Sequence, residues 1–269
     1  MEHQHIHHNH AISTWTEWIP VELMLVTGII YLIGFVRLRI CNARFSWGQL
    51  ISFQVGIGMV AVAMLPPLMH WAHQDLRGHM VIHLLIGMFA PIFLVMGAPV
   101  TMALKVLPTH LARSITAILS SRFFGLIGHP ITALLLNIGG MFVLYLTPLY
   151  NASLTNPYLH HLIHFHFLAA GYLYAWSLVG PDPAPGRPNL RVRMAVLFIG
   201  MGSHAFLSKF MYAYLYPINS PHSIEQIQEG AKLMYYWGDL SEIILAVILF
   251  YLWYQKRGQR KYSLSPMVS

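Results

Sequence analysis

Histidine is the residue type in this sequence with the greatest capacity for chemistry. The 269 residues include 17 histidines but a single cysteine, Cys41. His79 and His83 are four residues apart, as are His160 and His164, and this spacing places both rings of a pair on one face of a helix. Two such pairs on neighbouring helices can converge on one ion. One cysteine excludes an internal disulfide and a cysteine-rich metal site.

Further side chains could add ligands or fix the imidazole tautomers. Imidazole suits copper, iron and zinc, and nearby methionine thioethers favour Cu(I). The additional candidates come from the segments around the two pairs and from later apolar segments, and they are His70, His73, His161, His204, Asp239 and Glu242. Roles other than metal binding stay open at this point, because a histidine pair can also reach lipid headgroups and a carboxylate can cap a helix.

The composition identifies the setting of these residues as a membrane. Hydrophobic residues make up 56% of the chain and charged residues 9%, with a mean hydropathy of +0.55. A soluble domain is about 25% charged, so the composition excludes an ordinary soluble protein, a disordered chain and a disulfide scaffold. The net charge of +7 is attributed to cytoplasmic loops rather than to a nucleic-acid partner.

Apolar segments of about 20 residues predict an all-α polytopic bundle of seven transmembrane helices. The segments are 20–36, 47–69, 79–104, 130–150, 157–179, 192–216 and 231–254. Residues 107–124 form an amphipathic segment that we expect at the membrane interface. The chain therefore divides into a histidine-rich extracytoplasmic arm (1–19), a membrane domain (20–254) and a basic cytoplasmic tail (255–269).

The charges predict which side of the membrane each loop faces. With seven helices, 13 of the 16 basic residues fall on one side, which the positive-inside rule assigns to the cytoplasm. The N-terminus is then outside and the C-terminus cytoplasmic. Fifteen of the 17 histidines fall on the outer side or in the outer half of the bilayer. We expect a multi-pass protein of the bacterial cytoplasmic membrane, with a metal site in the outer half of the bilayer. His204 is expected near the middle of the sixth helix, and Asp239 and Glu242 are expected at the start of the seventh.

Three groups of residues resemble the CtaG-type family of cytochrome c oxidase (caa3-type) assembly factors over residues 47–254. The first runs from His79 and His83 through Ala90-Pro91 to Gly97-Ala98-Pro99. The second is Asn156-Pro157-Tyr158-Leu159-His160 with His164, Phe167, Trp176 and Gly180-Pro181-Asp182-Pro183, and the third is Ala205-Phe206-Leu207, Leu215-Tyr216-Pro217, Gly230 and Met234. The sequence departs from the family pattern at Gln228-Glu229, at His204 and in its histidine-rich arm.

The resemblance implies a membrane protein that helps a haem–copper oxidase mature by handling copper, and therefore an assembly factor rather than an enzyme. We expect copper to be held by His79, His83, His160 and His164 and passed to an oxidase subunit, with the lipid bilayer as the other partner and no nucleic acid. Two alternatives remain. His160-His161-x-x-His164 imitates the clusters of membrane di-iron oxidases and hydroxylases, and one histidine from each of two facing helices could ligate a b-type haem.

Overall fold

The computed structural model describes residues 3–184 and 186–263, with side chains for residues 17–184, 186–255 and 257. Within these residues every regular element is helical. The elements are α1 His3–Ile40, α2 Trp47–Ala63, α3 Pro66–Gln74, α4 Leu76–Leu84, η1 (a π-helix) Leu85–Phe89, α5 Ala90–Met96, α6 Pro99–Val106, α7 Thr109–Leu119, α8 Arg122–Ile127, α9 Pro130–Leu134, η2 (a π-helix) Leu135–Gly139, α10 Gly140–Leu146, α11 Leu149–Thr155, α12 Pro157–Val179, α13 Leu190–Tyr214 and α14 Ile224–Ser263.

Among the described residues, five helices are long and apolar enough to cross a membrane. They are Glu17–Ile40, Leu76–Met96, Pro157–Val179, Leu190–Tyr214 and Ile224–Gln255. Two bent helix pairs raise the number to as many as seven if each pair is one span. The prediction of an all-helical, multi-pass membrane protein is confirmed, whereas the side on which each terminus lies stays a prediction.

Two of the predicted spans are bent in the structure. The second predicted segment divides into α2 and α3, which meet at 55°, and the fourth divides into Pro130–Leu146 and α11, which meet at 77°. Proline begins the second helix of the first pair at Pro66, and Pro148 directly precedes α11. A proline lacks the N–H that a continuing helix needs, so the chain turns there.

The third and seventh predicted segments begin earlier than expected. Asp75 caps α4 with its side chain, so this span starts at Leu76. It continues through η1 and α5 to Met96, and Pro99 then opens the separate helix α6. Ser223 and Gln226 form reciprocal side-chain hydrogen bonds to backbone N–H groups, the capping-box arrangement that starts a helix. Because α14 therefore starts at Ile224, the expectation that Asp239 and Glu242 start the seventh helix is wrong, and both lie well inside it.

The two ends of the chain are helical where they are described. The backbone of α1 runs from His3 to Ile40, and α14 continues into the predicted tail as far as Ser263. The histidine side chains of the predicted arm lie outside the described residues, and so do residues 264–269. The predicted boundaries of arm, membrane domain and tail stay predictions.

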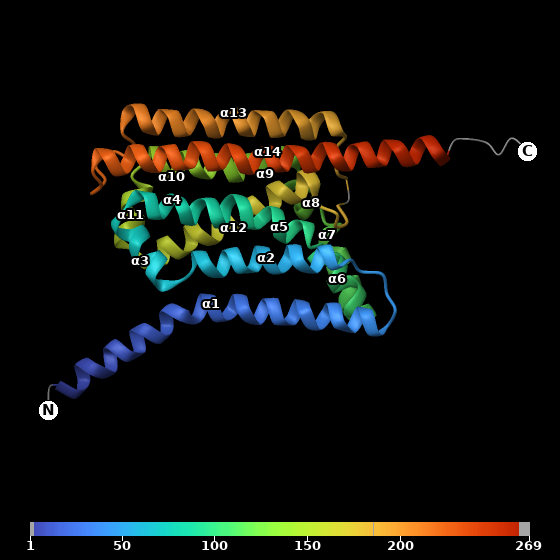
Figure 1. Cartoon of the computed structure of the whole chain (residues 1–269), viewed down its shortest axis with the longest axis horizontal. Coiled ribbons are helices and arrows are strands. Elements are labelled where there is room, and N and C mark those ends of the chain that lie inside the picture. Colours follow the sequence, from blue (N-terminus) through green and yellow to red (C-terminus); the bar gives the residue numbers. More distant parts are fainter. Residues whose placement is uncertain (1–2, 185, 264–269) are drawn as a thin grey trace, which may run out of the picture.

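The centre of the bundle is formed by α4, η1, α5 and α12 (Figure 1). On one side α14 packs along α4, with α13 beyond it, and on the other side α2 packs along α5, with α1 beyond it. The short helices α3 and α11 lie together at one end of the bundle, and α6, α7 and α8 lie at the other end. The histidine pairs of α4 and α12 are therefore surrounded by protein rather than by lipid.

Candidate metal centre

The helix start at Asp75 positions the first histidine pair. The Asp75 carboxylate accepts a hydrogen bond from the backbone N–H of Arg77 at 2.9 Å and pairs with its guanidinium at 2.6 Å. Burial raises the pKa of Asp75, but the hydrogen bonds and charge of Arg77 outweigh this effect and hold the pKa below its usual value. With α4 anchored in this way, His79 and His83 lie one turn apart, and both are buried.

A second cap positions the histidine pair of α12. The Asn156 side chain accepts hydrogen bonds from the backbone N–H groups of Tyr158 and Leu159, and Pro157 occupies the first helical turn. His160 and His164 follow on α12, and both are buried. The backbones of α12 and η1 pack very closely at Gly171, where any Cβ would collide with the carbonyl oxygen of Gly87. This close packing draws the two histidine-bearing helices together.

The histidine rings of α3, α4 and α12 form a row. The ring centroids are 4.1 Å apart for His73 and His160, 4.2 Å for His160 and His164, and 6.2 Å for His164 and His79. A ligating nitrogen lies about 1.1 Å from its ring centroid and about 2.0–2.1 Å from a metal ion, so two rings that share an ion have centroids at most about 6.3 Å apart. Each successive pair in the row is within that limit.

Most nitrogens of the buried rings lack hydrogen-bond partners, whereas His73 at the exposed end of the row is hydrogen-bonded through Nδ1 to the carbonyl oxygen of Met69. Both ring nitrogens of His79, His83 and His164 and Nε2 of His160 are buried and unpaired. A buried polar group without a partner costs about 1–3 kcal/mol, so native proteins rarely tolerate one without a reason. Several such nitrogens together in neighbouring rings are typical of metal-ligand sets.

A groove of about 590 Å³ connects the row to the surface. It opens between α1, α3 and α12, and its lining includes Met69, His70, His73 and His160. His73 is exposed, whereas His160 beside it is buried. The row therefore leads from the groove into the bundle.

Sequence reasoning missed two tyrosines and one histidine that surround His79. Tyr150 packs edge-on against His79 with centroids 5.0 Å apart, and Tyr145 lies 5.9 Å away. The Tyr150 hydroxyl is hydrogen-bonded to Nε2 of His222 at 2.8 Å. No spacing in the sequence signals this contact, because Tyr150 lies past the sharp bend before α11 and His222 lies in a loop.

The other predicted ligands do not all join this row. His83 packs against Phe167 and Tyr145, His70 lies at the surface 3.4 Å from Glu17, and His161 is exposed. Within the described residues, one set of three possible ligands has ligand atoms all within 4.8 Å of one another, and its members are His204, Asp239 and Glu242. The four histidines predicted to bind copper do not close to that spacing, so their joint role stays a prediction. The candidates form two groups instead of one.

Comparison with known proteins supplies the family. A family model described as cytochrome c oxidase caa3 assembly factor matches residues 29–256, most of the chain. The chain belongs to the cytochrome c oxidase caa3 assembly factor family. The resemblance inferred from the sequence is thereby confirmed.

Three relatives of the chain are mycobacterial proteins. Uncharacterized proteins of Mycobacterium bovis and Mycobacterium tuberculosis are each 33% identical to it over 189 residues, and one of Mycobacterium leprae is 30% identical. The match covers 68% of this chain but 29% of each relative, so the chain corresponds to less than a third of these proteins. No solved structure matches the chain.

Two of the residue groups on which the resemblance rests contact each other at the opposite end of the bundle. The carboxylate of Asp182 accepts hydrogen bonds from the backbone N–H groups of Val100 and Thr101 at 3.1 and 2.7 Å. These N–H groups lie in the first turn of α6, which begins at Pro99 directly after Ala98, a residue with a φ of 52°. The pairing of the two motifs is structural, and it ties the start of α6 to the loop after α12.

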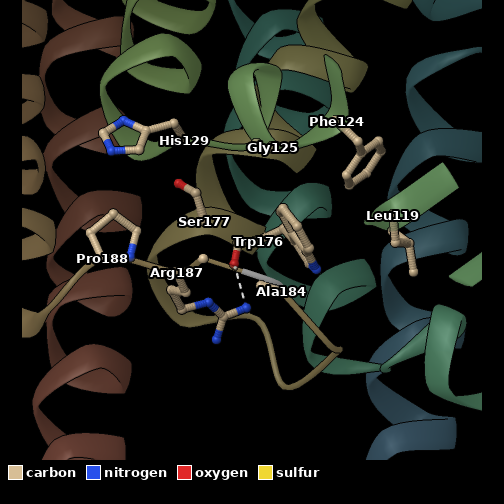
Figure 2. A pocket seen from close by; sticks show the side chains of 11 residues that line it. Leu119, Phe124, Gly125, His129, Trp176, Ser177, Ala184, Arg187 and Pro188 are labelled. Carbon is tan, nitrogen blue, oxygen red and sulfur yellow. Dashed lines mark hydrogen bonds between the residues drawn. The ribbon is translucent and has the colours of Figure 1, made fainter. Parts of the chain in front are cut away.

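A small cavity near this loop is closed by Arg187 (Figure 2). The Arg187 guanidinium donates hydrogen bonds to the carbonyl oxygens of Gly180 at 2.6 Å and Trp176 at 3.2 Å. These carbonyls end α12, where a cation is favourable. The cavity holds about 10 Å³, which leaves no room for a ligand larger than a single water. The hydrogen bonds of Arg187 therefore serve to fix the end of α12.

Proposed function

We propose that this chain takes part in the assembly of a caa3-type cytochrome c oxidase by binding copper between α4 and α12 and releasing it to an oxidase subunit. The observation that carries this proposal is the row of buried, unpaired imidazoles in which His79, His164 and His160 lie within ion-sharing distance of their neighbours. Family membership supports the oxidase as the destination of the metal. Copper is the cargo in this scheme.

The donor types favour copper over other metals. The row offers neutral imidazole nitrogens, and the groove at its outer end adds the thioethers of Met64 and Met69. Thioether and imidazole together suit Cu(I), whereas magnesium and calcium need oxygen ligands. His83 lies one turn further along α4 than His79 and completes the proposed ligand set of His79, His83, His160 and His164.

Short steps between rings support transfer by ligand exchange. His73 at the groove and His160 inside it have centroids 4.1 Å apart, and His164 follows at 4.2 Å. An ion can therefore gain one imidazole before it loses the previous one, and it need not cross the apolar interior uncoordinated. The oxidase subunit would take the ion at the groove, where His70 and His73 are exposed.

Metal content of the purified protein tests the proposal. We expect the double variant His79→Ala/His160→Ala to lose bound copper and to impair oxidase maturation in cells. His110→Ala is the matched control, because His110 is exposed on α7 at the other end of the bundle. Copper content and oxidase activity equal to the control in the double variant would overturn the proposal. Iron in the same sample would favour the di-iron alternative, and a Soret absorption band would favour a haem.

A further inference from the structure

A second group of unpaired ligands lies between α13 and α14. His204 is 0% exposed and Glu242 is 2% exposed, and neither the two ring nitrogens nor the two carboxylate oxygens have a hydrogen-bond partner. His204 Nδ1 lies 4.0 Å from Glu242 Oε2, and half-buried Asp239 brings a carboxylate oxygen within 4.8 Å of both. These three side chains are called the inner group below.

The packing of α13 on α14 is adapted to the imidazole of the inner group. Any Cβ at position 238 would collide with the His204 ring, so Gly238 provides the space in which the ring lies. Two nearby hydroxyls do not serve the group, because Ser208 and Ser241 are each hydrogen-bonded to a carbonyl oxygen of their own helix. The nearby cation Lys209 lies over the ring of Tyr235 instead, 4.9 Å from its centroid.

The spacing of the inner group fits one metal ion. Nitrogen and oxygen ligands bind zinc at about 2.0–2.2 Å, so two of them can be at most about 4.2–4.3 Å apart on one ion. The 4.0 Å between His204 and Glu242 already meets this limit. The widest pair of the group, within 4.8 Å, reaches this limit if the two ligand atoms approach each other by about 0.5 Å. A buried carboxylate is costly without a compensating cation, and a divalent ion would supply the charge.

The donors of the inner group differ from those of the copper row. One imidazole with two carboxylates is a harder set than imidazoles with thioethers, and it suits Zn(II) better than Cu(I). We propose that His204, Asp239 and Glu242 hold a divalent cation of the Zn(II) class at a second site inside the bundle. This site goes beyond the copper site of the proposed function.

The test uses the full-length protein in detergent after treatment with a chelator. Co(II) serves as an optical probe for a Zn(II) site, and Zn(II) is then added to displace it. We expect one equivalent of Co(II) with visible d–d absorption in the unaltered protein and at least tenfold weaker binding in Glu242→Gln. Glu229→Gln is the matched control, because Glu229 lies on the same helix but is partly exposed and paired with Lys232. Co(II) binding by Glu242→Gln equal to this control would overturn the proposal.

The same experiment separates this proposal from the copper site. His79→Ala/His160→Ala should keep the Co(II) signal and lose Cu(I), whereas Glu242→Gln should lose the Co(II) signal and keep Cu(I). Loss of Co(II) binding in the histidine double variant would overturn the proposal of a separate inner site. Retention of copper by the same variant would overturn only the proposed function.

Folding controls keep the result interpretable. Glutamine matches the shape of Glu242 without its charge, so the metal-free Glu242→Gln protein should unfold at an equal or higher temperature than the metal-free parent. Gly238→Ala offers an independent variant that leaves all three ligands in place but displaces the His204 ring. We expect it to weaken Co(II) binding at least tenfold as well, and unchanged binding there would contradict the site.

Discussion

The ring of His164 on α12 faces the ring of His79 on α4, with centroids 6.2 Å apart and planes inclined by 31°. Because about 6.3 Å is the limit for two imidazoles on one ion, an ion shared by this pair would be held in a nearly linear arrangement. Cu(I) accepts such low coordination. His160 lies beside His164 at 4.2 Å, where it can exchange with either ligand.

This relationship predicts unequal effects of two single substitutions. His164→Ala should weaken Cu(I) binding at least tenfold, because it removes the ring between His79 and His160. His83→Ala should have a smaller effect, since His83 packs against Phe167 at 4.7 Å and Tyr145 at 6.2 Å. Competition with a chromophoric Cu(I) chelator measures both affinities. An equal or larger loss in His83→Ala would show that the ion lies deeper along α4.

The two tyrosines around His79 predict opposite changes in stability. Tyr150→Phe removes a 2.8 Å hydrogen bond and leaves Nε2 of His222 unpaired, so it should lower the free energy of unfolding by about 1–2 kcal/mol. Tyr145→Phe removes a buried hydroxyl that has no partner, and it should be neutral or stabilising. Thermal unfolding in detergent compares the two, and each serves as the control of the other. A larger loss in Tyr145→Phe would reveal an unrecognised partner of its hydroxyl.

Asp75 predicts how acid affects the start of α4. Its pKa is held below the usual value of 3.8 despite burial, because Arg77 binds the ionised form. The stabilisation is therefore complete above pH 3.8 and is lost as the pH falls below that value through the folded-state pKa. Asp75→Asn keeps a capping side chain but has no charge to titrate. Its unfolding temperature should fall less than that of the parent between pH 5 and pH 3, and equal slopes would contradict the assignment.

The sequence predicts the parts of the fold that depend on local signals. Asn156 followed by Pro157 is a strong helix start, and α12 covers the predicted residues 157–179. The four-residue spacing of His160 and His164 then fixes the face that they share. The start of α14 was missed because the cap formed by Ser223 and Gln226 lies in a polar stretch that hydropathy does not distinguish from a loop.

The division of the candidate ligands into two groups could not be predicted from the sequence. It depends on how α14 packs, since α14 lies beside both α4 and α13 and presents Glu242 to His204 on α13. Hydropathy gives the spans but not their neighbours in the bundle. The fit of the His204 ring against Gly238 is likewise a tertiary contact, and a glycine within an apolar helix does not identify its partner.

The contact between Asp182 and the start of α6 predicts a purely structural effect far from the histidines. Asp182 is 2% exposed, and its carboxylate accepts the N–H groups of Val100 and Thr101. Asp182→Ala would leave two donors without an acceptor and should cost about 2–4 kcal/mol of stability, whereas Asp182→Asn keeps one acceptor oxygen and should lose less. Thermal unfolding should therefore rank the parent above Asp182→Asn and Asp182→Ala lowest. The copper content of the folded fraction should stay unchanged in both variants, because α4 and α12 keep their caps at the other end. A stable Asp182→Ala protein without copper would instead connect this end of the bundle to the metal.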